Sequence, residues 1–164
     1  MTASELRTHL RYSTWASRRV LDAVLKLEPE QQQRDLGCSH KGLLDTLRHI
    51  QFGDSIWLTR IQGEQYQPPT DPIETDWPRV QKAWEQWSDS LTDAEVTRLV
   101  AYKDMKGNPY ETPVWQICLH VVNHATLHRG QVMAMLRQIG VPPPPTDLIF
   151  YYREYYREHS REQK

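Results

Sequence analysis

Apolar residues recur at helical spacing over four long segments of this chain, and this pattern restricts its fold more than any other feature. Large apolar side chains repeat every three or four residues in each segment, as in helices that bury one face. We expect the helices at about residues 3–27, 39–61, 76–90 and 113–139. Turn-forming residues separate them, since Pro29, Gly63 and Gly140 stand just past segment ends. The pattern predicts an all-α four-helix bundle in which residues 1–164 form one domain.

Smaller signals set the starts of two helices and the connections between them. Ser39 and Asp76 are preferred N-cap residues in front of the second and third segments, and Pro78 falls near the first turn of the third. Residues 96–113 interrupt the helical pattern around a central Lys-Gly-Asn, which predicts a small hairpin before the last long helix. Residues 147–160 are expected to form a short C-terminal helix.

The charge balance and the cysteine content limit the classes of function. Lys and Arg total 20 and Asp and Glu total 21, so the net charge is -1 and no binding of nucleic acid is expected. The first residues are polar, unlike a signal peptide, and no apolar stretch reaches the roughly 18 residues of a membrane span. Cys38 and Cys118 lie far apart in the sequence. We therefore expect a cytoplasmic protein with free thiols and no membrane contact.

The fourth segment carries two histidines on its apolar stripe. The stripe advances by alternating steps of four and three residues, and it consists of Ile117, Val121, His124, Leu127 with His128, Gln131 and Met135. Such steps mark the seam of a bundle helix, so both imidazoles are predicted to point into the core. Residues four apart have Cβ atoms about 5–6 Å from each other, which lets two imidazoles share one metal ion. A core histidine is more often a hydrogen-bonded structural residue, so the spacing alone leaves both roles open.

A third ligand is expected from the second helix. His49 stands in line with Ile56, so it borders an apolar face, and Gly53 leaves room beside it. Three imidazoles leave coordination positions for water or a substrate, as in catalytic rather than closed structural sites. The candidate ligands for one divalent metal ion, zinc or nickel, are therefore His49, His124 and His128.

Several residues near these histidines have two interpretations. Asp45 and Asn123 could orient an imidazole or could face solvent. His120, one turn before His124, could be a fourth ligand or an orienting group. Cys38 lies at a helix start, where a thiolate is favoured, but no base stands nearby in the sequence and we expect an inert thiol. The histidines expected at the surface are His9, His40 and His159.

Three segments of the chain carry a family resemblance. They are Leu-Leu-Asp-Thr-Leu-Arg-His-Ile at residues 43–50, His-Val-Val-Asn-His-Ala-Thr-Leu-His-Arg-Gly-Gln-Val at residues 120–132, and the tail Pro-Pro-Thr-Asp-Leu-Ile-Phe-Tyr-Tyr at residues 144–152. Together with Trp57 they resemble the DinB/YfiT-like family of metal-dependent four-helix-bundle proteins. The resemblance implies that one histidine of the second helix and two of the fourth hold the metal, and by position these are His49, His124 and His128.

The resemblance also bears on function. Some relatives are transferases that use bacillithiol, mycothiol or glutathione, which implies a metal-dependent thiol S-transferase that acts on a small-molecule substrate. Two other interpretations stay open, a non-catalytic metal or small-molecule binding stress protein and a metal-dependent hydrolase that activates water. No internal nucleophile or glutamate base stands beside the histidines, so no catalytic residue is assigned. Arg129 and Gly130 also match the motif, and we expect structural roles for both, with Gly130 allowing helices to approach closely.

The aromatic tail predicts a homodimer. It contains more aromatic side chains than one face of a short helix can bury, and these are Phe150, Tyr151, Tyr152, Tyr155 and Tyr156. Dimerisation is also in keeping with the family resemblance. The alternative is that the tail packs back on its own bundle and closes the metal pocket.

Overall fold

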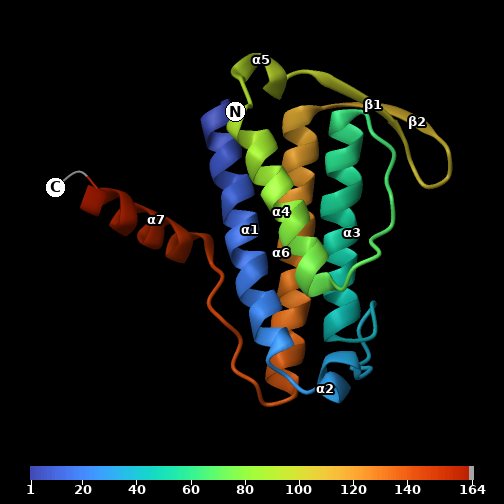
Figure 1. The fold of residues 1–164 in the computed structure, drawn as a ribbon, viewed down its shortest axis with the longest axis vertical. Coiled ribbons are helices and arrows are strands. Elements are labelled where there is room, and N and C mark those ends of the chain that lie inside the picture. Colours follow the sequence, from blue (N-terminus) through green and yellow to red (C-terminus); the bar gives the residue numbers. More distant parts are fainter. Residues whose placement is uncertain (163–164) are drawn as a thin grey trace.

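The long helices of the chain run side by side as a bundle (Figure 1). The computed structural model describes the backbone of residues 1–162, with the side chains up to Tyr155 and that of Arg157. In chain order the elements are α1 (Ala3–Leu25), α2 (Pro29–Gln33), α3 (Leu43–Gln62), α4 (Ile73–Asp89), α5 (Asp93–Val96), β1 (Leu99–Lys103), β2 (Pro109–Pro113), α6 (Val114–Gln138) and α7 (Leu148–Glu162). Helices α1, α3, α4 and α6 form the bundle, which confirms the predicted all-α four-helix architecture. Among the described residues, no helix is long and apolar enough to cross a membrane.

The first bundle helix begins at a signal that its sequence carries. The Thr2 hydroxyl accepts a hydrogen bond from the Glu5 N–H at 3.2 Å, and the Glu5 carboxylate accepts one from the Thr2 N–H at 2.8 Å. This capping box satisfies two backbone donors that have no partner inside the helix. Buried residues then follow every three or four positions as far as Val24, and the helix ends at Leu25, close to the predicted end.

The prediction that Ser39 caps the second bundle helix is wrong. Helix α3 begins at Leu43, and Gly42 is its N-cap. Residues 38–41 form a tight turn instead, in which the Lys41 N–H donates to the Cys38 carbonyl at 2.9 Å and Lys41 has a φ of 63°. The turn delays the start of the helix, because a left-handed residue cannot belong to a right-handed helix. The predicted end is confirmed, since Gly63 caps the helix with a φ of 74°.

The prediction that Asp76 caps the third bundle helix is also wrong. Helix α4 begins three residues earlier, at Ile73, with Pro72 as its N-cap. Asp76 lies in the first turn, where its carboxylate accepts a hydrogen bond from the Gln51 side chain of α3. Pro78 therefore stands inside the helix rather than at its start. The sequence does not distinguish an acidic residue at the N-cap from one in the first turn, because both positions favour an acidic side chain.

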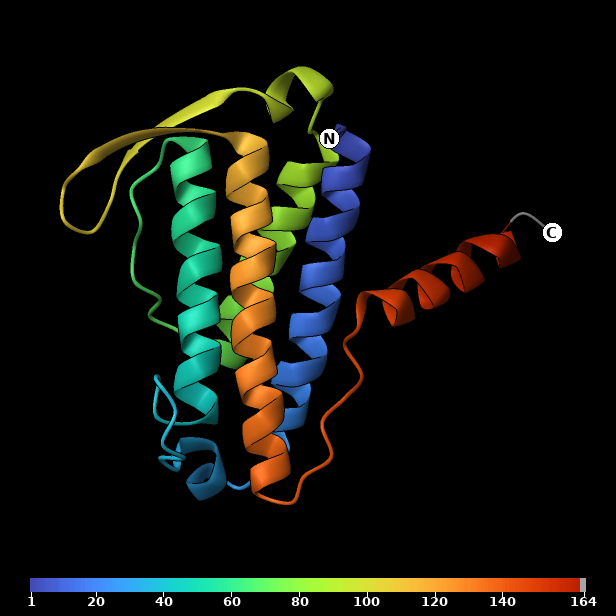
Figure 2. The ribbon, with the colours of Figure 1, turned by 180° about the vertical axis from the view of Figure 1, so that it is seen from behind.

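The predicted hairpin is confirmed. Strands β1 and β2 pair antiparallel, with Leu99 opposite Pro113 and Tyr102 opposite Tyr110, and Gly107 in the turn has a φ of 87°. The hairpin extends sideways from the end of the bundle, beyond α3 (Figure 2). The one-turn helix α5, which the sequence pattern did not predict, lies just before the hairpin, and its last residue, Val96, is the first of the segment expected to form the hairpin.

The core contains two groups of buried apolar side chains and, among them, buried polar ones. One apolar group includes Leu10, Leu58, Trp84 and Val121, and the other includes Val20, Ile50, Trp77 and Ala125. Every bundle helix also buries polar side chains. Those that we call the polar cluster are Ser13, Ser17, Asp54, Gln81 and Arg129.

The first turns of α7 pack against α1 of the same chain. Tyr151 is buried, and its ring centroid lies 5.6 Å from that of Trp15. Glu154 accepts a hydrogen bond from the Trp15 indole at 2.9 Å and forms an ion pair with Arg19 at 2.7 Å. Part of the aromatic stripe is therefore covered without a partner chain, on the α1 side of the bundle. The side chain of Tyr156, which belongs to that stripe, lies outside the described residues.

Candidate metal centre

Helices α3 and α6 bring the three predicted ligands together. His49 comes from α3, and His124 and His128 come from successive turns of α6. The Nε2 atoms of His49 and His124 are 2.9 Å apart, and the ring centroids of His49 and His128 are 4.5 Å apart. His128 is buried, whereas the other two rings are half-buried and reachable from solvent. The seam position of the α6 pair and the facing position of His49 follow from the helical spacing.

A fourth histidine joins them, and its predicted place at the surface is wrong. His40 lies in the turn before α3 and stacks on His49, with ring centroids 3.9 Å apart and an interplanar angle of 20°. Its centroid is 5.2 Å from that of His128. The ligand nitrogens of His40, His49 and His128 lie within 4.8 Å of one another, a compact group that does not include His124. We call His40, His49, His124 and His128 the histidine cluster.

Of the other two histidines expected at the surface, His9 is half-buried on α1, away from the cluster. The side chain of His159 lies outside the described residues.

Gly53 makes room for the cluster, but beside a different ring from the one predicted. A Cβ atom on Gly53 would lie 2.9 Å from Cε1 and 3.0 Å from Nδ1 of His124. Ordinary side chains do not tolerate such distances, so the His124 ring occupies the space that a larger residue would fill. The glycine of α3 thus allows the imidazole of α6 to lie directly against the backbone of the facing helix.

Gln131 orients His128, a role that the sequence pattern did not predict. The Gln131 side-chain oxygen lies 2.8 Å from Nδ1 of His128. An amide oxygen only accepts, so this contact places the proton on Nδ1 and leaves Nε2 free as a ligand atom. Gln131 stands three residues after His128 on the same stripe, so its position in the sequence carried the signal. The two candidates predicted from the sequence face solvent: Asp45 pairs with Arg48, and Asn123 donates to the Leu119 carbonyl.

The surroundings of His49 and His124 keep these two imidazoles neutral. Burial, followed by the neighbouring imidazoles, lowers the pKa of His49 and that of His124 to about 4. No carboxylate stands among the described groups that act on either pKa. Neutral imidazole is the form that binds a metal, so protons compete weakly for these nitrogens. An all-nitrogen donor set of this kind fits zinc, nickel, copper or iron.

Three residues, His120, Cys118 and Cys38, lie near the cluster in the sequence but are not members of it. His120 is exposed, with its ring edge against Trp57 at 5.3 Å and its centroid 5.8 Å from that of His124. Burial raises the pKa of the Cys118 thiol to about 12, so this cysteine is inert. Cys38 is half-buried in the turn that carries His40, and both cysteines are free thiols.

Arg129 and Gly130, which follow His128, differ in their roles. Arg129 is only 2% exposed and points into the bundle, where it donates to the hydroxyl groups of Ser13 and Ser17. This confirms a structural role for Arg129. Gly130 is exposed, and a Cβ atom there would meet nothing within 4 Å, so the idea that it allows close helix packing is wrong.

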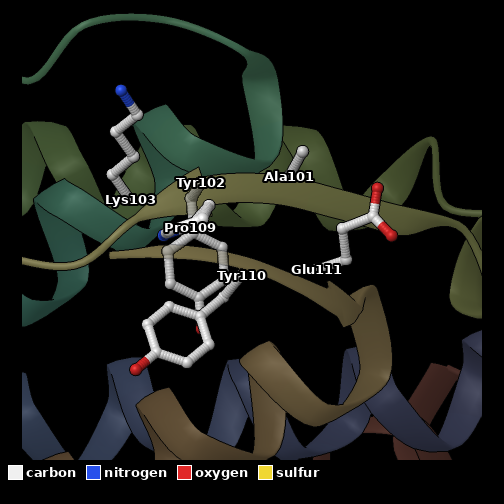
Figure 3. Close-up of a pocket in the computed structure, with 6 residues that line it drawn as sticks. All are labelled: Ala101, Tyr102, Lys103, Pro109, Tyr110 and Glu111. Atoms are coloured by element: carbon white, nitrogen blue, oxygen red, sulfur yellow. The ribbon is translucent and has the colours of Figure 1, made fainter. Parts of the chain in front are cut away.

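A separate pocket lies on the hairpin. It measures about 550 Å³ and is lined by Ala101, Tyr102, Lys103, Pro109, Tyr110 and Glu111 (Figure 3). The rings of Tyr102 and Tyr110 stack with centroids 5.8 Å apart. The pocket is open to solvent and contains no residue of the histidine cluster, so we assign the chemistry to the cluster.

The fold and the cluster define a class, the four-helix-bundle proteins that gather histidines between two facing helices. The chain belongs to the DinB family, whose model matches residues 1–160. It is 26% identical over 155 residues to Protein DinB of Bacillus subtilis (strain 168), a match that covers 85% of this chain and 89% of the relative.

A solved structure agrees in fold. The crystal structure of a DinB-like protein from Bacillus cereus ATCC 10987 superposes with a TM-score of 0.54 and 20% sequence identity. The superposition covers 84% of this chain and 94% of the other.

Proposed function

We propose that this protein binds one divalent metal ion, zinc or nickel, through His49, His124 and His128, and transfers a low-molecular-weight thiol to a small electrophilic molecule. The observation that carries the proposal is the gathering of three imidazoles at the α3–α6 interface. Burying several imidazoles that face one another costs free energy unless a ligand satisfies their nitrogen atoms. A metal ion is the ligand that suits such a donor set.

A thiol cosubstrate fits the surroundings of the cluster better than hydrolysis does. A metal ion bound here would favour the thiolate form of a thiol that coordinates it. A hydrolase would also need a general base next to the site, and no carboxylate acts on the pKa of His49 or His124 among the described residues. In the proposed reaction the thiol sulfur forms a bond to the electrophile, the leaving group departs, and the thiol proton goes to solvent through the open side of the cluster.

The three histidines have different roles in this proposal. His128 is held by Gln131, so its Nε2 is aimed before any ion arrives. His49 and His124 are half-buried, and they form the side of the cluster that a substrate can reach. The same lack of an internal base suits a non-catalytic metal or small-molecule binding protein, which is the second candidate.

Elemental analysis tests the metal site. Protein purified without a histidine tag should contain about one equivalent of divalent metal, and single changes His49→Ala, His124→Ala and His128→Ala should each remove it. His9→Ala is the matched control, because His9 lies on α1 away from the cluster. Loss of metal in the control, or retention in all three cluster variants, would contradict the proposed ligand set.

A reaction screen separates the two candidate functions. The metal-loaded protein is incubated with a small electrophile and, in turn, with bacillithiol, mycothiol and glutathione, and the conjugate is measured by mass spectrometry. The transferase proposal predicts conjugate that depends on the metal and on one of the thiols. A loaded protein that is inert with all three would favour the binding protein.

We also propose a homodimer in a reducing compartment. The free thiols of Cys38 and Cys118 suit such a compartment. Ile149, at the start of α7, is 51% exposed and leaves an apolar side chain available to a second copy. Light scattering at micromolar concentration should report twice the chain mass of 19.4 kDa, and a particle of the single mass would refute the dimer.

A further inference from the structure

The turn that carries His40 has a backbone conformation that is held by hydrogen bonds. The Leu36 N–H donates to the Lys41 carbonyl at 2.9 Å, and the Gly42 N–H donates to the His40 carbonyl at 2.8 Å. Lys41 adopts a φ of 63°, which few residues other than glycine do. A Cβ atom on Gly42 would overlap the carbonyl oxygen of Arg34. The backbone on both sides of His40 is thus held by hydrogen bonds and close packing, and residues in sparsely populated conformations concentrate at functional sites.

The turn delivers His40 to the cluster from outside the helices. Its ring lies face to face with His49 and edge to face with His128, and it is half-buried. Its ligand nitrogen lies within 4.8 Å of those of His49 and His128. A stack of two imidazoles does not by itself point both sets of nitrogens at one ion, because ligand rings radiate from a metal. His40 is thus close enough to join the site, and its ring would rotate off the His49 face to point at the same ion.

We propose that His40 is an exchangeable fourth ligand of the metal site. This inference rests on the proposed metal site formed by His49, His124 and His128. Three imidazoles fill three positions of a tetrahedral zinc site, and the fourth is the position that a thiol or substrate takes. His40 closes that position when no thiol is present and leaves it when a thiol binds. As its imidazole leaves, one metal–nitrogen bond would be exchanged for one metal–sulfur bond, the thiol proton would go to solvent, and the other ligands would stay in place.

The origin of each ligand explains why His40 is the one that leaves. His49, His124 and His128 stand on long helices whose packing fixes their Cα atoms. His40 stands on a solvent-facing turn, and its neighbours Ser39 and Lys41 are exposed. Rotation of one side chain on a fixed turn needs no change in the bundle. An internal ligand that competes with the thiol also lowers the apparent affinity for the thiol, which suits a site that must release its product.

Cobalt substitution tests the proposal, because the visible spectrum of Co²⁺ reports the number and kind of its ligands. Tag-free protein, His40→Ala and His40→Phe are loaded with Co²⁺ and titrated with 2-mercaptoethanol, and far-UV circular dichroism checks that each variant is folded. Both variants should still bind one Co²⁺, with a spectrum changed from that of the wild type. Their apparent affinity for the thiol should rise about tenfold, because the internal competitor is gone.

The phenylalanine variant separates ligation from stacking. Phenylalanine preserves the ring that covers His49 but has no ligand nitrogen, so it should behave like alanine if His40 is a ligand. If His40→Phe matches the wild type in spectrum and thiol affinity, His40 only positions His49 and the proposal is overturned. Loss of all Co²⁺ from His40→Ala would also overturn it, because His40 would then be a permanent ligand. If the wild type itself takes up no Co²⁺, the proposed metal site fails as well, and elemental analysis of the wild type distinguishes this failure from the others.

Discussion

The protein contains two sets of inward-facing polar side chains, the partly buried histidine cluster and the buried polar cluster, and they satisfy their polar atoms in different ways. In the polar cluster, Arg129 donates to the hydroxyl groups of Ser13, Ser17 and Thr126 at 2.9–3.2 Å. Asp54 accepts a hydrogen bond from the Trp77 indole at 2.8 Å. In the histidine cluster, by contrast, the rings mainly face one another.

This difference suits a structural role for the polar cluster and a ligand-binding role for the histidine cluster. Most polar atoms of the polar cluster find partners inside the chain, although the buried Nε2 of Gln81 has none among the described residues, and such a set stabilises one arrangement of the helices without needing a ligand. In the histidine cluster, Gln131 holds Nδ1 of His128, and the Nε2 atoms of His49 and His124 lie within hydrogen-bond distance of each other at 2.9 Å, so the imidazoles are paired mainly with one another. We therefore expect the imidazoles, rather than the polar cluster, to take a ligand from outside the chain. The same bundle thus contains a polar cluster that stabilises the fold and a histidine cluster that is the candidate metal site. On α6 the two clusters meet at adjacent residues, His128 and Arg129.

The largest effect is expected from the polar cluster. Arg129→Ala should lower the free energy of unfolding by about 3–5 kcal/mol, because it leaves buried hydroxyl groups unpaired and removes the cation near Asp54. Urea unfolding of the metal-free protein measures this. Arg137→Ala, an exposed residue of the same helix, should change the value by no more than about 0.5 kcal/mol. Equal effects of the two changes would show that the polar cluster does not support the bundle.

Metal removal should affect stability through the histidine cluster alone. With free metal at about 100 times its Kd, binding adds about 2.7 kcal/mol, or roughly 5–10 °C in Tm for a chain of this size. A chelator should abolish that increase in the wild type and should leave the Tm of His128→Ala unchanged. Differential scanning calorimetry measures both. A chelator effect of the same size in the variant would place the stabilising metal elsewhere.

The two clusters should also give the metal-free protein opposite dependences on pH. The pKa of His49 and of His124 is lowered from 6.5 to about 4 on folding, so between these values the unfolded chain binds more protons. Their contribution to stability is present above pH 6.5 and is lost as the pH falls toward 4. Burial raises the pKa of Asp54 from 3.8 to about 7, so there the folded chain binds more protons. That contribution is present below pH 3.8 and is lost as the pH rises through 7.

Replacing Asp54 separates the two slopes. Asp54→Asn preserves an oxygen that can accept the Trp77 hydrogen bond and removes the titration. Between pH 4 and 6.5 the free energy of unfolding of this variant should therefore rise more steeply with pH than that of the wild type. Urea unfolding at several pH values, with metal absent, provides the measurement. Parallel curves for the two proteins would mean that Asp54 does not titrate in this range.

The helices of the bundle could be predicted from the sequence because apolar spacing is a property of each segment by itself. For the same reason, helical spacing alone was enough to find the seam that carries His124 and His128 and the facing position of His49. The starts of α3 and α4 could not be predicted, since Ser39 and Asp76 have the right chemistry for caps and the choice of the first helical residue depends on tertiary contacts.

His40 escaped prediction for a related reason. Its place in the cluster depends on a turn closed by Gly42 and by Lys41 in a left-handed conformation. No periodicity reveals where such a turn directs a side chain, and a histidine in a polar segment is typical of a surface residue. Gln131 was different, because its position three residues after His128 was visible and only its role was missed.

The smallest effect is expected from Gly53, the one residue that fits the facing helix to the cluster. Gly53→Ala would place a methyl group 2.9 Å from Cε1 of His124, so the ring must move by a few tenths of an ångström. We expect a roughly tenfold loss of metal affinity, comparable with the loss of a group that orients a ligand, while the bundle remains folded. Competition with a chromophoric chelator measures the affinity.

Gly130→Ala is the matched control for this last prediction, because it makes the same change in an equally helical position. The added methyl group meets nothing within 4 Å, so metal affinity should stay unchanged. Alanine should also stabilise α6 by about 0.5–1 kcal/mol, since glycine loses more backbone freedom on folding. The pair therefore separates a local steric effect from a general effect of helix propensity. If Gly53→Ala leaves the affinity unchanged, or if Gly130→Ala lowers it equally, the space beside His124 is not what shapes the metal site.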